Sequence, residues 1–182
     1  MSKKYLVTGA NGYIGRYVVK NLLDRGNTVI ASDLNYDGLD ERAIRSKVNL
    51  FGGDADIYHQ FEEPDVCIHL AWRNGFVHNH DSHITDIPNH YLFIKNMIEG
   101  GLKHIVVMGS MHEIGYWEGA IEESTPANPK SNYGIAKNTL RQLTTLLTSQ
   151  HDICMQWIRG YYILGDDLKN SSVFTKITKL EQ

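Results

Sequence analysis

The stretch Thr8-Gly-Ala-Asn-Gly-Tyr-Ile-Gly15 decides the fold. It follows a short apolar run and leads directly into residues with helical periodicity, so its three glycines stand at a strand–turn–helix junction. The spacing suits three needs: a tight turn, close approach of a phosphate, and packing of the helix on the strand. Amide groups at the start of the helix can then hold phosphate oxygens. The stretch therefore predicts a dinucleotide-binding turn.

Outward from this turn, Val- and Ile-rich runs alternate with longer stretches of helical period, as in βαβ units. The predicted strands are Tyr5–Thr8, Thr28–Ser32, Val48–Phe51, Val66–Leu70, Ile105–Met108 and Ile153–Ile158. The predicted helices are Tyr13–Arg25, Leu39–Ser46, Ile57–Phe61, Pro88–Gly100 and Asn132–Ser149. Two long loops, Trp72–Thr85 and Met111–Lys130, are expected to serve function. We expect an α/β fold, a Rossmann-type doubly wound parallel sheet with helices on both faces.

The composition is that of an ordinary one-domain protein of 182 residues. Its net charge of -3 offers no general attraction to nucleic acid or an anionic membrane, so we expect neither as a partner. The sequence shows neither a secretory signal nor a membrane-spanning apolar run, which predicts a cytoplasmic protein. Cys67 and Cys154 lie in apolar runs and are expected to be buried, reduced thiols.

Two acidic residues follow predicted strands. Asp33 closes the second strand, where a carboxylate accepts hydrogen bonds from ribose hydroxyls and repels a 2′-phosphate, which favours NAD over NADP. The guanidinium of Arg16 could pair with that phosphate, so NADP remains the alternative cofactor. Asp54 is a candidate for the adenine edge or, alternatively, a cap for the segment that begins at Asp56.

Tyr133 and Lys137 form a Y-x-x-x-K pattern on a predicted helix, one turn apart on the same face. We expect the ammonium to lower the pKa of the phenol and fit it for acid–base chemistry. Ser110 ends a predicted strand at the carboxyl edge of the sheet, where open α/β sheets bind ligands. Its alternative role is that of a serine at a strand end.

Together with His69-Leu-Ala71, Gly109-Ser110 and Glu123–Pro129, these motifs resemble the extended short-chain dehydrogenase/reductases, a family of sugar-nucleotide epimerases, dehydratases and reductases. The resemblance implies NAD, a nucleotide-sugar substrate, hydride transfer at a sugar carbon, and a catalytic triad of Ser110, Tyr133 and Lys137. It implies that the cofactor touches Tyr133 and Lys137 of this triad and also the following residues: Gly9, Asn11, Gly12, Tyr13, Ile14, Gly15, Asp33, Asp54, Ala55, Leu70 and Ala71. It requires no metal, and it suggests a homodimer built on the helices Pro88–Gly100 and Asn132–Ser149.

Two departures from the family pattern limit this expectation. Met111 and His112 stand where family dehydratases have an Asp-Glu pair, which makes epimerisation or reduction the expected reaction, with His112 or Glu113 as an optional extra acid or base. Family members also continue into a C-terminal substrate domain. We therefore expect a cofactor domain at 1–165 and only the start of a substrate-binding portion, with a helix, at 166–182. A cofactor-binding scaffold without catalysis is the alternative.

Several other residues admit a functional reading. His78, His80 and His83 could suggest a metal site, but their spacing favours a solvated or substrate-lining loop. Trp72 and Arg73 follow the fourth strand and are expected to pack or to contact substrate. Tyr161 and Tyr162 are expected to pack. The sequence leaves open the sugar, the nucleotide and the direction of the reaction.

Overall fold

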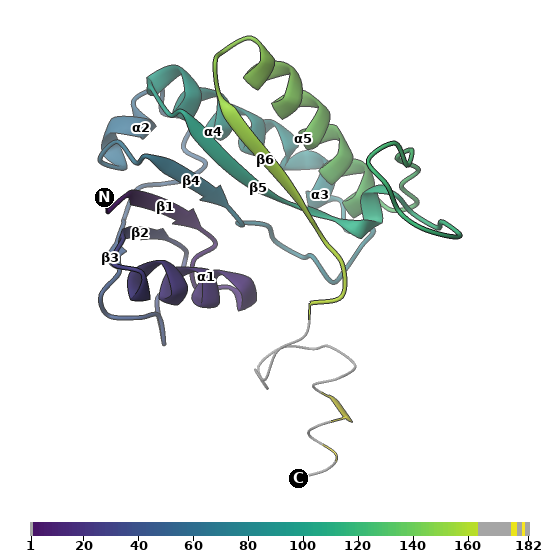
Figure 1. The fold of residues 1–182 in the computed structure, drawn as a ribbon, viewed down its shortest axis with the longest axis horizontal. Coiled ribbons are helices and arrows are strands. Elements are labelled where there is room, and N and C mark those ends of the chain that lie inside the picture. The colour runs from purple at the N-terminus through teal and green to yellow at the C-terminus, as the bar shows by residue number, and fades with distance from the viewer. Residues whose placement is uncertain (1, 164–175, 178–179, 181–182) are drawn as a thin grey trace.

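The computed structural model describes residues 2–163, 176–177 and 180 (Figure 1). The expected C-terminal portion at 166–182, with its predicted helix, therefore falls outside the described residues except at three positions. No helix in the described ranges is both long and apolar enough to cross a bilayer.

Six parallel strands form one sheet in the order β3-β2-β1-β4-β5-β6. The strands are β1 (Lys4–Thr8), β2 (Thr28–Ser32), β3 (Ile44–Arg45), β4 (Val66–His69), β5 (His104–Ser110) and β6 (Cys154–Gly160). This is the order of a doubly wound dinucleotide-binding fold, so the predicted fold class is confirmed. The strand order reverses between β1 and β4, and ligands of such sheets bind at the carboxyl ends of these strands.

Helices cover both faces of the sheet, with α1 on one side and α4 and α5 on the other (Figure 1). The helices are α1 (Tyr13–Asp24), α2 (Ile57–Gln60), α3 (Ser82–Thr85), α4 (Ile87–Gly100) and α5 (Asn132–Ser149), with a 3₁₀ turn, η1, at Met111–Glu113. Pro88 in the first turn of α4 and the Ser131 side chain, which accepts a hydrogen bond from the Gly134 amide at the start of α5, fix two of the helix starts.

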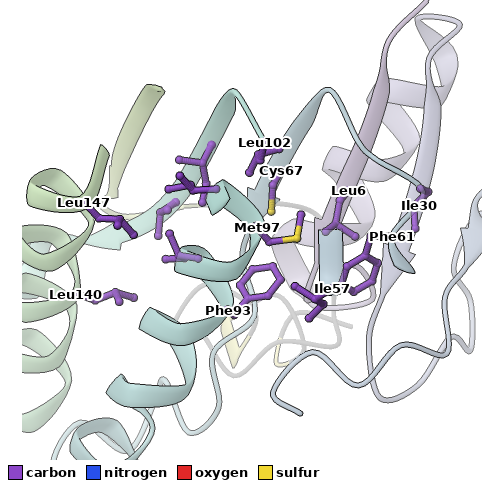
Figure 2. Close-up of a cluster of buried hydrophobic side chains, with 14 residues drawn as sticks. Leu6, Ile30, Ile57, Phe61, Cys67, Phe93, Met97, Leu102, Leu140 and Leu147 are labelled. Carbon is purple, nitrogen blue, oxygen red and sulfur yellow. The ribbon is translucent and has the colours of Figure 1, made fainter. Parts of the chain in front are cut away.

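The alternation of side chains along β1 separates two hydrophobic cores. Leu6 points into the larger core, where it meets Phe61, Phe93 and Met97 from the α2 and α4 side (Figure 2). Val7 points into the smaller core against Val19 of α1. Both faces of the central strand are therefore buried, which is why β1 is apolar at successive positions.

The segment between β2 and α2 departs from the prediction, because Leu39–Ser46 is not a helix and Val48–Phe51 is not a strand. Short polar side chains accept hydrogen bonds from backbone amides that would otherwise donate within a helix or to a neighbouring strand. The Asp40 carboxylate accepts the Arg42 amide at 3.1 Å, the Ser46 hydroxyl accepts the Val48 amide at 3.2 Å, and the Asn49 side chain accepts the Phe51 amide at 3.2 Å. The third strand is instead the two-residue β3.

Smaller corrections concern the cysteines and one loop. Cys67 is buried in β4, and burial raises the pKa of its thiol, but Cys154 at the start of β6 is exposed, contrary to expectation. The predicted loop at Trp72–Thr85 contains the one-turn helix α3, which the sequence analysis missed.

Candidate active site

The glycine-rich turn is shaped by close backbone contacts. A Cβ atom on Gly9, whose φ is +65°, would lie 2.8 Å from the Ala71 nitrogen, and one on Gly15 would lie 2.1 Å from the Gly9 oxygen. Real side chains do not tolerate such distances, so both positions require glycine. Gly12 is the N-cap of α1, and the first amides of a helix have no partner within the helix itself. The motif thus forms the cradle that its spacing predicts.

Asp33 supports this turn from the end of β2. Its carboxylate accepts hydrogen bonds from the Asn11 amide at 2.8 Å and from the Leu34 amide at 2.7 Å. The Asn11 side chain donates to the Asp37 carbonyl, while its Oδ1 atom is buried and has no hydrogen-bond partner within the described residues. A buried acceptor without a partner is costly, so Oδ1 is a suitable acceptor for a ligand.

Asp54 makes local hydrogen bonds ahead of α2, although the N-cap residue of that helix is Asp56. Its carboxylate accepts the Asp56 amide at 2.9 Å and the Gln60 side chain at 2.6 Å, and these hydrogen bonds lower its pKa. Asp54 and Ala55 are exposed and are absent from the residues that line the cleft described next. Their contact with the adenine stays a prediction.

A cleft of about 520 Å³ opens at the carboxyl ends of β1, β4 and β5. Nine of the expected site residues line it: Gly9, Gly12, Tyr13, Ile14, Gly15, Leu70, Ser110, Tyr133 and Lys137. Three other expected residues do not line the cleft. Asn11 belongs to the turn, Asp33 accepts a hydrogen bond from the Asn11 amide, and Ala71 lies against Gly9. The fold therefore brings the glycine turn and the Ser110–Tyr133–Lys137 set, more than 90 residues apart in sequence, to one cavity.

Lys137 is buried behind the cleft. Its Nζ atom donates to the Met108 carbonyl at 2.7 Å and lies 3.8 Å from the centre of the Trp72 ring, a cation–π contact. Burial lowers the pKa of the ammonium to about 7, although the charge of Glu113 opposes this shift. Lys137 therefore holds its proton less tightly than an exposed lysine does.

Tyr133 does not show the lowered pKa that we expected. Burial raises the pKa of the phenol, and a hydrogen bond with the Ser110 side chain opposes that shift. The ammonium of Lys137 lies 5.9 Å from the centre of the Tyr133 ring and is directed to Met108 and Trp72 instead. The helix places Tyr133 and Lys137 on the same face, but packing directs the ammonium away from the phenol. Desolvation of the phenol therefore shifts its pKa more than the attraction to Lys137 does.

Trp72 packs behind the pair and also lines the cleft. Its indole stacks on His90 with ring centres 4.5 Å apart and donates to His83 Nδ1 at 3.0 Å. His83 is buried, so the expectation of a solvated loop is wrong for this residue. The three loop histidines do not gather: His83 faces Trp72, and His78 faces the cleft.

His69 and His90 extend this buried layer toward β1. The His69 ring lies 2.8 Å from the Thr8 hydroxyl through Nδ1 and 2.8 Å from His90 Nδ1 through Nε2. Burial lowers the pKa of His69 well below its usual value and that of His90 to about 3. Both rings are therefore neutral at neutral pH. His90 was not predicted as a site residue, although the sequence places it in the predicted helix, two residues after Pro88.

The cleft mouth contains residues with other expected roles. Tyr161 and Tyr162 line it and are exposed, so the prediction that they pack is wrong. His78 and His112 also line it, with ring centres 4.2 Å apart. Burial lowers the pKa of His112, and the nearby His78 ring lowers it further. Arg73 is turned away in an exposed ion pair with Asp86 at 2.5 Å.

With this geometry in hand, comparison with known proteins identifies the family. A model of the NAD dependent epimerase/dehydratase family matches residues 5–180. The chain belongs to this family. The resemblance inferred from the motifs is thereby confirmed.

Within this epimerase/dehydratase family, the chain is 45% identical over 183 residues to the dTDP-6-deoxy-L-talose 4-dehydrogenase (NAD(+)) of Aggregatibacter actinomycetemcomitans, a match that covers 97% of this chain. The fold is similar to that of the UDP-glucose 4-epimerase of Thermotoga maritima, solved with UDP-glucose, with a TM-score of 0.81 at 20% identity over 97% of this chain. It is equally similar to MoeE5 in complex with UDP-glucuronic acid and NAD, with a TM-score of 0.81 at 21% identity over 97% of this chain.

The chain is shorter than these family members. It spans 67% of the talose dehydrogenase, 62% of the Thermotoga epimerase and 60% of MoeE5. At 20–21% identity the two structures support the fold alone.

Proposed function

We propose that this chain forms the cofactor-binding and catalytic part of an NAD-dependent enzyme that oxidises or epimerises a hydroxyl-bearing carbon of a nucleotide-sugar, or reduces a keto carbon of one. The observation that carries the proposal is the single cleft that contains both the glycine turn and Ser110, Tyr133 and Lys137. The 45% identity to a dTDP-sugar 4-dehydrogenase that uses NAD(+) supports both the cofactor and the substrate class.

The turn fits NAD by its shape and by its polar groups. Gly9 and Gly15 allow the close backbone contacts that form the turn, and the start of α1 offers amides to a pyrophosphate. The partnerless Oδ1 of Asn11 and the carboxylate of Asp33 offer acceptors to ribose hydroxyls. Bound NAD would supply the hydride acceptor or donor for the reaction.

Ser110 and Tyr133 hold the reacting sugar oxygen and move its proton. Both residues line the cleft, and the Ser110 side chain acts on the pKa of the Tyr133 phenol, so a sugar oxygen bound beside them would contact both. The raised pKa of Tyr133 keeps the phenol protonated at neutral pH, which suits proton donation to a carbonyl oxygen. In the oxidative direction the same phenol needs a neighbouring positive charge, which Lys137 supplies when protonated.

The proposal includes a homodimer. The α4 and α5 helices pack together on one side of the sheet and leave apolar side chains exposed, namely Leu92, Ile135 and Leu146. A second copy would cover them. Light scattering should give the molar mass of a dimer, and Leu146→Asp should weaken dimerisation. A monomeric mass at every protein concentration would contradict the proposed homodimer.

Turnover tests the function most simply. The protein is incubated with NAD or NADH and a panel of dTDP- and UDP-sugars with a hydroxyl or keto group at C4. We expect cofactor turnover or an epimerised product with at least one of them, and Tyr133→Phe should lower kcat about 1000-fold because it removes the proton carrier while keeping the ring. The NAD dissociation constant should stay unchanged.

The control is Tyr116→Phe, whose exposed phenol lies outside the cleft and should not affect kcat. Turnover that survives Tyr133→Phe would contradict the proposed acid–base role. Saturable NAD binding without turnover of any sugar would favour a cofactor-binding module instead.

A further inference from the structure

Glu113 is a fully buried carboxylate directly behind Ser110. The η1 turn folds it back beneath the end of β5, where it is 0% exposed. Its Oε1 accepts the Ser110 amide at 2.7 Å, and its side chain and that of Ser110 form a reciprocal capping box. It is absent from the residues that line the cleft, so it cannot act as the extra acid or base that the sequence suggested.

The next strand supplies the other partners of this carboxylate. The Trp157 indole donates to both carboxylate oxygens at 3.0 Å, and Arg159 Nε donates to Oε2 at 3.0 Å. Arg141 of α5 lies farther away, at 3.8 Å. Every donor comes from an element that borders the end of β5. The carboxylate therefore ties Ser110 to β6 and, more loosely, to the helix that carries Tyr133.

The backbone leaves room for this arrangement. A Cβ atom on Gly109 would lie 2.2 Å from Trp157 Nε1 and 2.5 Å from Glu113 Oε1, so glycine is required there. The Glu113 carbonyl also accepts the Asn128 amide at 3.1 Å, which fixes the far end of the long loop at Met111–Lys130. A buried charge is costly unless it is fully paired, and a well-packed apolar residue could fill the same space. Simple space filling does not account for a carboxylate at this position.

We infer that Glu113 is a positioning residue that holds the backbone of Ser110, and through it the Ser110 hydroxyl, in register with Tyr133. Its catalytic consequence rests on the proposed function, whereas its effect on Ser110 does not. Since the carboxylate accepts hydrogen bonds from three donors, replacing one oxygen by an NH₂ group sets donor against donor.

Hydrogen exchange tests the positioning without turnover. In Glu113→Gln, the Ser110 amide should exchange about tenfold faster relative to the Val107 amide in the same strand, because it loses a charged acceptor. Trp157→Phe, which removes one donor and leaves the carboxylate, should give a smaller change in the same direction. Glu99→Gln, in an exposed pair with Lys95, is the matched control and should change neither amide. Equal acceleration at Ser110 and Val107, or none, would overturn the inference.

Kinetics test whether the effect passes through Ser110. Glu113→Gln should lower kcat about tenfold and leave the NAD dissociation constant unchanged, and it should cost less than about twofold when Ser110 is already Ala. An equal loss in both backgrounds would mean a general structural role and would overturn the inference. If the wild-type protein turns over no sugar, the proposed function fails, and the exchange result alone decides the role of Glu113.

Discussion

The two walls of the cleft are built from different kinds of interaction. The wall at Thr8–Gly15 is local: contiguous residues set its shape through backbone contacts, and one carboxylate, Asp33, braces it. The wall around Ser110 and Tyr133 is assembled from side chains of β4, β5, β6, α4 and α5. The first wall depends on small size at fixed positions, and the second depends on charges and rings whose partners are distant in sequence.

The backbone wall contributes the shape of the site, and the side-chain wall contributes its electrostatics. The backbone wall can accept a phosphate without any side-chain charge of its own, through amides and a helix terminus. The side-chain wall fixes protonation states: it keeps the rings of His69 and His90 neutral and moves the pKa of Lys137 to about 7. Substitutions in the first wall should therefore act on binding through sterics, and substitutions in the second should act through pH dependence.

The largest effect is expected at the backbone wall. Gly15→Ala places a methyl group 2.1 Å from the Gly9 oxygen, so the turn must open, and we expect a loss of about 3 kcal/mol in stability together with loss of NAD binding. Denaturant unfolding and calorimetry measure the two effects. The control is Gly26→Ala, which has no neighbour within 4 Å of the added Cβ but a φ of +77°; it should cost about 1 kcal/mol and leave NAD binding intact. Equal behaviour of the two variants would break the distinction between the walls.

A pH-dependent effect is expected at the side-chain wall. The pKa of His90 is lowered to about 3 in the folded protein, so the unfolded chain binds more protons as the pH falls below the usual histidine value. Stability is then fully present above that value and is lost toward the folded pKa, by about 2 kcal/mol per buried histidine between pH 7 and pH 5.

The variant His90→Asn should remove part of this loss, which urea unfolding at both pH values measures. The exposed His59 provides the control, since His59→Asn should leave the steep acid dependence in place. An acid dependence that is unchanged in His90→Asn would contradict the assignment of a buried neutral ring.

The smallest effect is expected at Asp33, a charged side chain that supports the backbone wall. Asp33→Asn keeps a side-chain acceptor for the Asn11 amide but removes the charge, so NAD affinity should fall by about 1 kcal/mol and the preference over NADP should narrow. Paired calorimetric titrations with NAD and NADP measure both changes. Discrimination against NADP that is as strong as in the wild type would show that Asp33 does not select the cofactor.

The same contrast explains what the sequence could predict. Periodicity located five of the six strands, and the spacing of Gly9, Gly12 and Gly15 located the turn, because both depend on neighbouring residues. The segment between β2 and α2 was misassigned because Asp40, Ser46 and Asn49 bond locally to the backbone, which hydrophobic patterning does not detect.

The candidate site was predicted in its residues but not in their surroundings. Order and spacing selected Ser110, Tyr133 and Lys137, which all line the cleft; their catalytic roles stay predictions. The pKa of Tyr133 was predicted in the wrong direction because burial depends on Trp72 and β5, which spacing does not reveal. The burial of Glu113 was not predicted because its partners, Trp157 and Arg159, lie more than 40 residues away.

The central claim is that both walls enclose one nucleotide site. Calorimetric titration of the purified 182-residue chain with NAD, and separately with NADP, tests it most directly. We expect saturable binding of one NAD per chain, tighter than that of NADP, and no saturable NAD binding to folded Gly15→Ala. A folded wild-type chain that binds neither nucleotide, or that binds NADP more tightly, would contradict it.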